Sequence, residues 1–324
     1  MVNKWIASQK DKLSWNKLVT GQNFYSIYHS YEWGEIKRQD GWQVLRIEKT
    51  LDQHTSLAQI FYKKLPLGLF FLWCPGGIIG QEKIVPLKEL KDLLKARWIY
   101  FRSSFHDGSL YDELLLNDGW KKPSFCINSN RSMNLALSKD IEEIKQQLST
   151  NWRHNLKRSE KKGVKIEVWE NPDPQVLESY YQEFEKMKGL DKQHSFETIK
   201  GSIEHFKDSL VILRAVSEDG KFLGLRGYVH LGKRALDWFA ISSESGRMLY
   251  ASYGLFWKII EDLKLKNIEN YDLSGVDPDN NPGVYNFKKG TGAEMVLYPG
   301  EFEISHNSFI SLIMNLMMKR KYGK

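Results

Sequence analysis

The chain has 324 residues, of which 41% are hydrophobic, 27% charged and 13% aromatic. This composition is typical of a folded globular protein, and it excludes a disordered, collagen-like or disulfide-stapled chain. Lysine and arginine outnumber aspartate and glutamate by 47 to 40, and the resulting charge of +7 is compatible with a polyanionic partner without requiring one. The length predicts about two domains.

Cysteine content and hydropathy exclude two further classes of protein. The two cysteines, Cys74 and Cys126, cannot form a disulfide framework, which favours a reducing cytoplasm. The N-terminus has no apolar stretch of signal-peptide length. The longest mainly apolar runs, residues 65–73 and 309–318, fall well short of the ~20 residues that a membrane-spanning helix needs. We therefore expect a cytoplasmic protein rather than an integral membrane protein.

The first half of the chain predicts strands followed by a helix and a further strand. Two runs rich in β-formers flank a polar turn at Asp52-Gln53, and a third apolar run ends at Pro75-Gly76-Gly77. Leucines at helical spacing follow. The predicted elements are strands over residues 42–48, 56–62 and 67–73, a helix over 85–96 and a strand over 98–101.

The second half repeats this order. The turns Glu218-Asp219-Gly220 and Gly232-Lys233 separate three apolar runs and predict a meander. The predicted elements are strands over residues 211–216, 222–231 and 234–241, a helix over 250–263 and a strand over 270–273. The repeated order predicts two α/β (α+β) units of similar topology, each with a mostly antiparallel sheet, although no residue-level repeat accompanies it.

A basic segment lies between the two halves. Ser138 can cap a helix that carries an apolar stripe and ends near Gly163. Arg153, Lys157 and Lys161 share one face of this helix at a spacing of four residues. That face is either a solvated helix surface or a ridge that meets phosphates.

The C-terminal segment, residues 309–324, combines large apolar side chains with a basic end. Two interpretations remain open for the amphipathic helix that it predicts. It either packs back on the body of the protein, most simply on the first unit, or makes a weak interfacial contact with a membrane.

Most standard catalytic constellations are absent from the sequence. The eight histidines lack metal-binding spacing, which predicts no bound metal. The sequence also has no phosphate-binding loop, no nucleophile elbow and no dinucleotide fingerprint, so we expect no cofactor. The remaining chemistry is transfer of an already activated group, which depends on positioning and oxyanion stabilisation.

The most distinctive motif lies near the C-terminus. The strand and turn Tyr271–Val276 lead through a loop rich in Asp, Asn and Pro to the segment Gly283–Glu294. In this segment Phe287 could anchor the chain while Lys288 places a cation near a developing oxyanion or a phosphate. The alternative is a hairpin whose lysines face solvent.

These segments, followed by Tyr298–Phe302, resemble the signature of the Fem family, the peptidoglycan interpeptide-bridge aminoacyltransferases. Residues 30–37, 72–78 and 151–164 resemble further family motifs, so the similarity extends from about residue 25 to 305. The chain has no room for the long coiled-coil arm of some relatives, and it therefore resembles the compact members.

The resemblance implies a fold and a reaction. The fold is two tandem acetyltransferase-like (GNAT) units, which we place at residues 1–140 and 141–305, followed by the tail helix at 306–324. The reaction moves an amino acid from aminoacyl-tRNA to the peptide-stem amine of a nucleotide- or lipid-linked peptidoglycan precursor. We expect a monomeric cytoplasmic enzyme, and the composition of the tail leaves open a peripheral contact with the inner face of the membrane.

The resemblance also assigns candidate site residues. Phe287 and Lys288 would face the aminoacyl end of the tRNA, and Lys37 with its neighbours would lie in the acceptor site. The candidate substrate-binding residues are Lys37, Trp33, Tyr31, Asp272, Tyr285 and Phe239. The candidate tRNA- or phosphate-binding residues are Arg153, Lys157, Lys161 and Lys289.

The sequence departs from the family pattern at three motifs. After Tyr180-Tyr181, where the family often has an arginine and a tyrosine, it has Lys186-Met187-Lys188-Gly189-Leu190. Arg102-Ser103-Ser104 lacks the acid expected there, and Thr291 replaces an aromatic residue. A second hypothesis keeps the fold and replaces the donor by acyl-CoA in surface polysaccharide biosynthesis, although the usual pyrophosphate-binding signature is missing. A third is an RNA-binding or scaffolding protein without activity.

Overall fold

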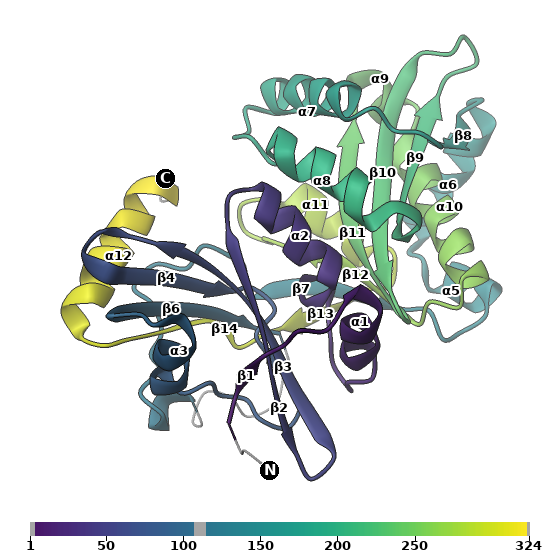
Figure 1. Cartoon of the computed structure of the whole chain (residues 1–324). Helices are drawn as coiled ribbons and strands as arrows, with labels where there is room; N and C mark the ends of the chain where they lie inside the picture. Colours follow the sequence, from purple (N-terminus) through teal and green to yellow (C-terminus); the bar gives the residue numbers. More distant parts are fainter. Residues whose placement is uncertain (1–3, 107–114, 323–324) are drawn as a thin grey trace. The chain divides into compact units, whose positions relative to one another are not determined.

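The computed structural model describes residues 4–106 and 115–322, which form two seven-stranded sheets with helices packed on them (Figure 1). The chain divides into two compact units. Unit 1 comprises Met1–Asn130 and Leu297–Lys324, and unit 2 comprises Arg131–Val296. Within the described ranges, no helix is both long and apolar enough to cross a membrane.

The sheet of unit 1 has the strand order β1-β2-β3-β4-β6-β14, with β5 paired to β3. In its central strands alternate residues pack in the core of the unit, namely Ala58 and Ile60 of β3 and Phe70, Leu72 and Cys74 of β4. The pair β4 and β6 is parallel, and the other pairs are antiparallel. The strands are β1 (Ile6–Ala7), β2 (Gln43–Leu51), β3 (His54–Lys64), β4 (Leu69–Cys74), β5 (Ile78–Ile79), β6 (Trp98–Phe105) and β14 (Gly300–Ser305).

Two helices of unit 1 begin at good capping residues. The side chain of Asp11 accepts a hydrogen bond from Ser14 N at the start of α1, and Ser30 does the same for Trp33 N at the start of α2. The helical segments are α1 (Lys12–Thr20), η1 (Ile27–His29), α2 (Tyr31–Gln39), η2 (Pro66–Gly68), α3 (Leu87–Leu94) and α12 (Ser308–Tyr322).

The sheet of unit 2 has the strand order β13-β7-β12-β11-β10-β9-β8. Strands β9, β10 and β11 form an antiparallel meander, whereas β11 and β12 run parallel because a helix connects them. The strands are β7 (Arg131–Ala136), β8 (Lys165–Val168), β9 (Leu210–Val216), β10 (Phe222–Leu231), β11 (Arg234–Ser242), β12 (Asn270–Gly275) and β13 (Glu294–Leu297).

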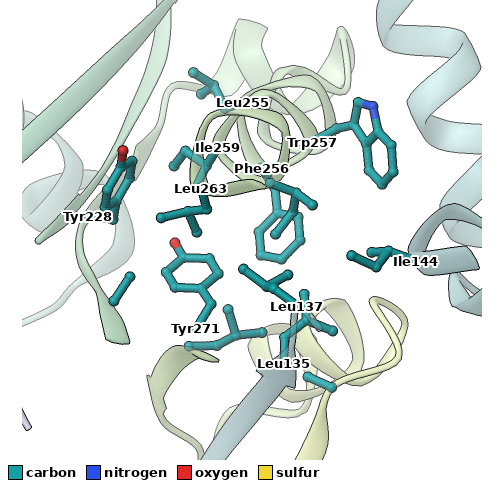
Figure 2. Close-up of a cluster of buried hydrophobic side chains, with 14 of the residues drawn as sticks. Leu135, Leu137, Ile144, Tyr228, Leu255, Phe256, Trp257, Ile259, Leu263 and Tyr271 are labelled. Atoms are coloured by element: carbon teal, nitrogen blue, oxygen red, sulfur yellow. The ribbon is translucent and has the colours of Figure 1, made fainter. Parts of the chain in front are cut away.

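Helices cover both faces of the unit 2 sheet (Figure 1). Neighbouring residues of β9 divide between the faces: Ile212 packs under α7 and α8, and Leu213 packs with α6 and α10. Figure 2 shows the cluster on the α6 and α10 side of the sheet, in which Phe256 and Ile259 of α10 pack with Tyr271 of β12. The helices are α5 (Ile141–Gln147), α6 (Thr150–Lys161), α7 (Pro174–Lys188), α8 (Phe196–Phe206), η3 (Lys207–Ser209), α9 (Glu244–Met248), α10 (Ala251–Leu265) and α11 (Pro282–Lys289).

The predicted order of strands and helices is confirmed in both units, but one predicted helix is wrong. The segment from Ser138 to Gly163 forms two helices, α5 and α6, because two caps compete within it. Asp140, not Ser138, caps α5 in a capping box with Glu143, and Ser149 then caps α6.

The structural units differ from the ranges expected from the sequence. The division falls at 130/131 and 296/297, where the sequence analysis placed it at 140/141 and 305/306. Strand pairing is the reason: β7 belongs to the unit 2 sheet, and β14 pairs with β6 of unit 1. The tail helix α12 packs on this same part of unit 1, and residues 323 and 324 of the predicted tail lie outside the described ranges.

Candidate active site

The candidate site begins where β12 ends. The Asp272 carboxylate accepts hydrogen bonds from Ser132 Oγ on β7 and from the backbone N of Ser274, at 2.8 Å in the latter case. Ser274 has a φ of 68°, in the left-handed region that residues with a Cβ rarely adopt. The pairing of β12 with β7 shifts register between Asp272 and Gly275, so the end of β12 does not follow the regular hydrogen-bond pattern of the sheet.

Lys288 reaches this strand end from α11. Asn281 caps the helix, and Pro282 occupies its first position, where a missing N–H costs nothing. The Nζ of Lys288 donates hydrogen bonds to the carbonyl oxygens of Gly275 at 2.9 Å and Ser274 at 3.3 Å. The Lys288 side chain is 7% exposed, so its cation is largely withdrawn from water. The sequence analysis foresaw the lysine but not the helix that carries it.

Phe287 anchors this end of α11 in the core of unit 2. Its ring packs against Trp152, Tyr253 and Phe256 at centroid distances of 5.5, 5.2 and 5.9 Å. The indole N–H of Trp152 also donates to the Phe287 carbonyl at 3.1 Å. Aromatic packing therefore fixes the direction of the helix, and with it the position of the Lys288 amine.

A buried ion pair lies beside these residues. Arg226 of β10 donates to both carboxylate oxygens of Asp237 on β11, at 2.8 and 2.7 Å. The hydroxyl of Tyr271 donates to the same carboxylate at 2.8 Å. The guanidinium carbon lies 5.4 Å from the centre of the Phe287 ring, which links the pair to α11.

Burial sets the electrostatics of the group. It lowers the pKa of Lys288 to about 8, while the neighbouring Asp237 and Asp272 carboxylates oppose this shift. Burial also raises the pKa of Asp272, against the hydrogen bond that Ser132 donates to it. A lysine with this pKa can change protonation state near neutral pH, and while protonated it supplies a positive charge beside the strand end.

The other unit 2 candidates lie in different surroundings. Tyr285 is half-buried on α11, and its ring lies 5.7 Å from the exposed ammonium of Lys289. Phe239 is fully buried under α7 and α8, with Tyr181 and His194 at centroid distances of 5.9 and 5.3 Å. The structure therefore groups Asp272 with Lys288 and places Phe239 in a different hydrophobic cluster.

Of the three α6 cations that were predicted to meet phosphates, one is already bound to another part of the protein. Arg153 is half-buried, and its guanidinium donates to the Gln146 carbonyl at 2.9 Å. Lys157 and Lys161 are exposed. Lys161 borders an open hollow of about 480 Å³ whose lining also includes the carboxylates of Glu218 and Asp219.

The unit 1 candidates gather on α2. Lys37 Nζ pairs with Asp40 at 2.6 Å and lies 4.5 Å from the centre of the Trp33 ring. The Arg46 guanidinium stacks on Tyr31 at 3.7 Å and donates to the Tyr31 carbonyl. The three residues predicted to bind the acceptor, Tyr31, Trp33 and Lys37, therefore lie on one helix. The two aromatic rings among them each contact a cation.

Part of the chain that carries this site matches a known protein family. Residues 187–319 match the model of the FemAB family, and this range includes the whole of α11 and the strand end that it faces. This part of the chain belongs to the FemAB family. No curated protein matches the sequence.

Three solved structures share the fold of this chain at low sequence identity. FemX is 15% identical with a TM-score of 0.76, and the match covers 96% of this chain and 100% of FemX. The C-terminal domain of a putative lysylphosphatidylglycerol synthetase from Agrobacterium fabrum is 14% identical, with a TM-score of 0.56 and 95% and 98% coverage. A tandem GNAT protein from the clavulanic acid biosynthesis pathway is 11% identical, with a TM-score of 0.53 and 94% and 98% coverage.

These comparisons confirm two predictions. The protein has two GNAT-like units, as the repeated order of elements indicated. It is an acyltransferase of the FemAB type.

Sequence reasoning missed three members of the candidate site, namely Arg226, Asp237 and Ser132. None of them lies in a motif. One signal was available for the ion pair: Arg226 and Asp237 each interrupt an otherwise apolar predicted strand, and charged residues in buried strands are normally paired. Ser132 gave no signal, because its contact with Asp272 depends on pairing between strands 140 residues apart.

Proposed function

We propose that this FemAB-family protein transfers an amino acid from aminoacyl-tRNA to the peptide-stem amine of a peptidoglycan precursor in the cytoplasm. The family match and the fold shared with FemX support a bridge-forming acyltransferase. The observation that carries the proposal is Lys288, a buried lysine held by α11 at an irregular strand end beside Asp237 and Asp272.

The reaction needs few protein groups because the ester is already activated. The neutral acceptor amine attacks the ester carbonyl carbon and forms a C–N bond, which pushes negative charge onto the carbonyl oxygen. The ester C–O bond then breaks, and the proton lost by the amine goes to the departing ribose hydroxyl. A fixed cation near the carbonyl oxygen stabilises the charge that develops, and this is the role proposed for protonated Lys288.

The surroundings of Lys288 fit this role. Its amine already donates to the carbonyls of Ser274 and Gly275, so it is held in place before a substrate arrives. A third N–H of the ammonium is available for an oxyanion, since a protonated lysine carries three donors. Phe287 keeps α11 in position through its aromatic neighbours.

The acceptor and the tRNA are assigned to other surfaces of the protein. Lys37, Trp33 and Tyr31 on α2 are proposed to contact the peptidoglycan precursor, and Lys157 and Lys161 are proposed to contact tRNA phosphates. Both proposals rest on the family resemblance, and the exposure of the two α6 lysines supports the second.

The test is a reconstituted transfer reaction read by mass spectrometry. The full-length protein is incubated with a nucleotide-linked or lipid-linked pentapeptide precursor, tRNA, an aminoacyl-tRNA synthetase and its amino acid. The expected product is heavier than the precursor by one amino-acid residue, and its formation requires tRNA. An acyl-mass gain with acyl-CoA alone, or an aminoacylated phosphatidylglycerol when that lipid is supplied, would contradict the proposal.

A further inference from the structure

The C-terminal helix α12 buries two methionines with a serine and an asparagine, and it exposes five other large apolar side chains. The side chains on its buried face, each 3–5% exposed, are Ser311, Met314, Asn315 and Met318. The side chains on its outer face, 39–67% exposed, are Phe309, Leu312, Ile313, Leu316 and Met317. This arrangement is the reverse of a helix whose outer face meets only water, in which the apolar stripe turns toward the core.

Specific contacts hold the helix in this orientation. The amide of Asn315 donates to Glu303 Oε2 of β14 at 2.6 Å, and the hydroxyls of Ser311 and Ser305 share a hydrogen bond of 2.8 Å. Met314 and Met318 pack with Tyr100 of β6. Turning the helix to bury its leucines would break these bonds and leave buried polar atoms without partners. The outward apolar face is therefore specified by the fold.

The exposed residues form one continuous stripe. They recur at spacings of three and one from Phe309 to Met317, which places them along a single side of about two and a half helical turns. Isolated exposed apolar residues are ordinary on protein surfaces, whereas a stripe of this length marks an interaction site. Figure 1 shows the helix in yellow near the C-terminus, beside the strands of unit 1.

The charge of α12 indicates the kind of partner. The helix contains no acidic residue, and its last turn carries three exposed cations, Lys319, Arg320 and Lys321. Apolar side chains beside clustered cations complement the boundary between acyl chains and anionic headgroups. At 15 residues the helix is shorter than the ~20 residues needed to span a membrane.

We propose that α12 is an interfacial membrane anchor that lies along an anionic lipid surface, with its leucine and methionine face in the outer acyl region and its basic turn among the headgroups. A second copy of the chain fits this face less well. A 15-residue helix is about 22 Å long and about 10 Å across, so one face offers about 220 Å². A stable interface needs about 800 Å² from each partner. The proposal does not depend on the identity of the donor or the acceptor.

The test is sedimentation of the full-length protein with vesicles of phosphatidylcholine containing 30% phosphatidylglycerol, compared with pure phosphatidylcholine. Binding to the anionic vesicles should be at least tenfold tighter, and high salt should weaken it. The variant Leu312→Glu with Leu316→Glu should weaken binding at least tenfold. Both leucines are exposed, so the fold should be retained, as checked by circular dichroism. The matched control adds the same charge elsewhere through Leu13→Glu with Leu265→Glu, which are 79% and 82% exposed, and should bind within twofold of the unaltered protein.

Three outcomes would overturn the proposal. The first is the absence of binding to anionic vesicles by the unaltered protein. The second is an equal loss in both double variants, which would show that net charge alone controls binding. The third is a dimer in light scattering that the α12 variant dissociates while vesicle binding is unchanged, which would assign the face to a second copy.

Discussion

Each unit contains a parallel strand pair. We call the pair in unit 1 closed, because its strands stay hydrogen-bonded to their ends, and the pair in unit 2 open, because its strands separate after a short paired stretch. Strands β4 and β6 stay paired from Leu69 with Trp98 to Cys74 with Ser103. Strands β11 and β12 pair only from Arg234 with Asn270 to Leu236 with Asp272. Beyond that point the unit 2 strands separate, and the lysine of α11 reaches the end of β12.

The corresponding end in unit 1 is filled instead. The ring of His29 packs on the turn after β4 so closely that a Cβ on Gly76 would lie 2.6 Å from its Nε2. His29 is 1% exposed, and burial lowers its pKa to about 4. The comparison teaches that a repeated fold need not repeat its chemistry. A charged site forms where neighbouring strands separate, and an uncharged packed turn forms where they do not.

Breaking the ion pair beneath the open end should produce the largest effect. Arg226→Met leaves the buried Asp237 carboxylate without its cation, and we expect the free energy of unfolding to fall by about 3–5 kcal/mol. The measurement is urea unfolding followed by tryptophan fluorescence. Adding Asp237→Leu should restore much of the loss, since no unpaired charge then remains. A loss below about 1 kcal/mol in the single variant would mean that water reaches the pair.

Removing the lysine at the open end should abolish most of the activity. We expect Lys288→Ala to keep its fold and to lower turnover by about 10²–10³, because one oxyanion-stabilising group is lost. Lys289→Ala, at an exposed neighbour, is the control and should change turnover little. Lys288→Arg should restore only part of the rate, since a guanidinium is wider and directed differently. Near-full activity of Lys288→Ala with aminoacyl-tRNA would contradict the assigned role.

The same role predicts the pH dependence of turnover. Because the pKa of Lys288 is about 8, the ammonium is lost as the pH rises through that value, and turnover should fall. Lys288→Arg keeps its charge, so the fall should be absent near pH 8 in that variant. Because the acceptor amine must itself be neutral, the rate of the unaltered protein is compared with that of Lys288→Arg at each pH, and a constant ratio of the two rates through pH 8 would contradict the role.

The closed end of unit 1 should respond to acid. In the folded chain the pKa of His29 is about 4, below the ~6.5 of an unfolded histidine, so the unfolded state binds the proton first. The stabilising contribution of neutral His29 is complete above pH 6.5 and is lost as the pH falls toward 4, by about 3 kcal/mol. Burial also lowers the pKa of the neighbouring His106 to about 4, so His29→Gln should remove its own share of this dependence in urea unfolding, while the exposed His54→Gln should leave the dependence unchanged. Parallel curves for the two variants would exclude His29 as the cause.

The smallest effect is expected at the surface of unit 2. If Lys157 and Lys161 contact tRNA phosphates, changing both to Ala should reduce the slope of log affinity against log salt by about 1.5. Lys186→Ala with Lys188→Ala, two exposed lysines on α7, is the matched control and should leave the slope intact. Filter binding at several salt concentrations measures both. Equal slopes in the two double variants would show that the α6 lysines face solvent and do not contact tRNA phosphates.

Local patterns were sufficient to predict most of the fold. Alternating apolar runs predicted β9, β10 and β11 to within a residue, and leucine spacing predicted α3 and α10. The split between α5 and α6 was missed because Asp140 and Ser149 are both good caps, and periodicity does not decide between them. Helix α11 was missed because its glycine and proline content resembles a loop, although Pro282 at the first helical position is compatible with a helix.

The site was predictable only where its residues lie in one motif. Phe287, Lys288 and Asp272 belong to two nearby segments and were found together. Arg226 and Asp237 were missed because the antiparallel pairing of β10 and β11 alone brings them into contact. Phe239 was expected at the substrate, and its position under α7 and α8 follows from a register shift between β10 and β11. At this bulge Gly227 pairs with Phe239 and Tyr228 with Asp237, so Phe239 and Asp237 lie on opposite faces although they are two residues apart.

Unit 1 is interrupted in the sequence by the whole of unit 2, and this has a consequence for biosynthesis. Glu301 of β14 receives hydrogen bonds from Arg102 Nε at 2.8 Å, Ile127 N at 3.1 Å and Asn128 N at 2.9 Å. A ribosome supplies Arg102 first and Glu301 about two hundred residues later. Until then β6 is an unpaired sheet edge and the guanidinium lacks its carboxylate. Unit 2 is therefore the part of the nascent chain that can finish folding first, and unit 1 waits for the last 28 residues to emerge.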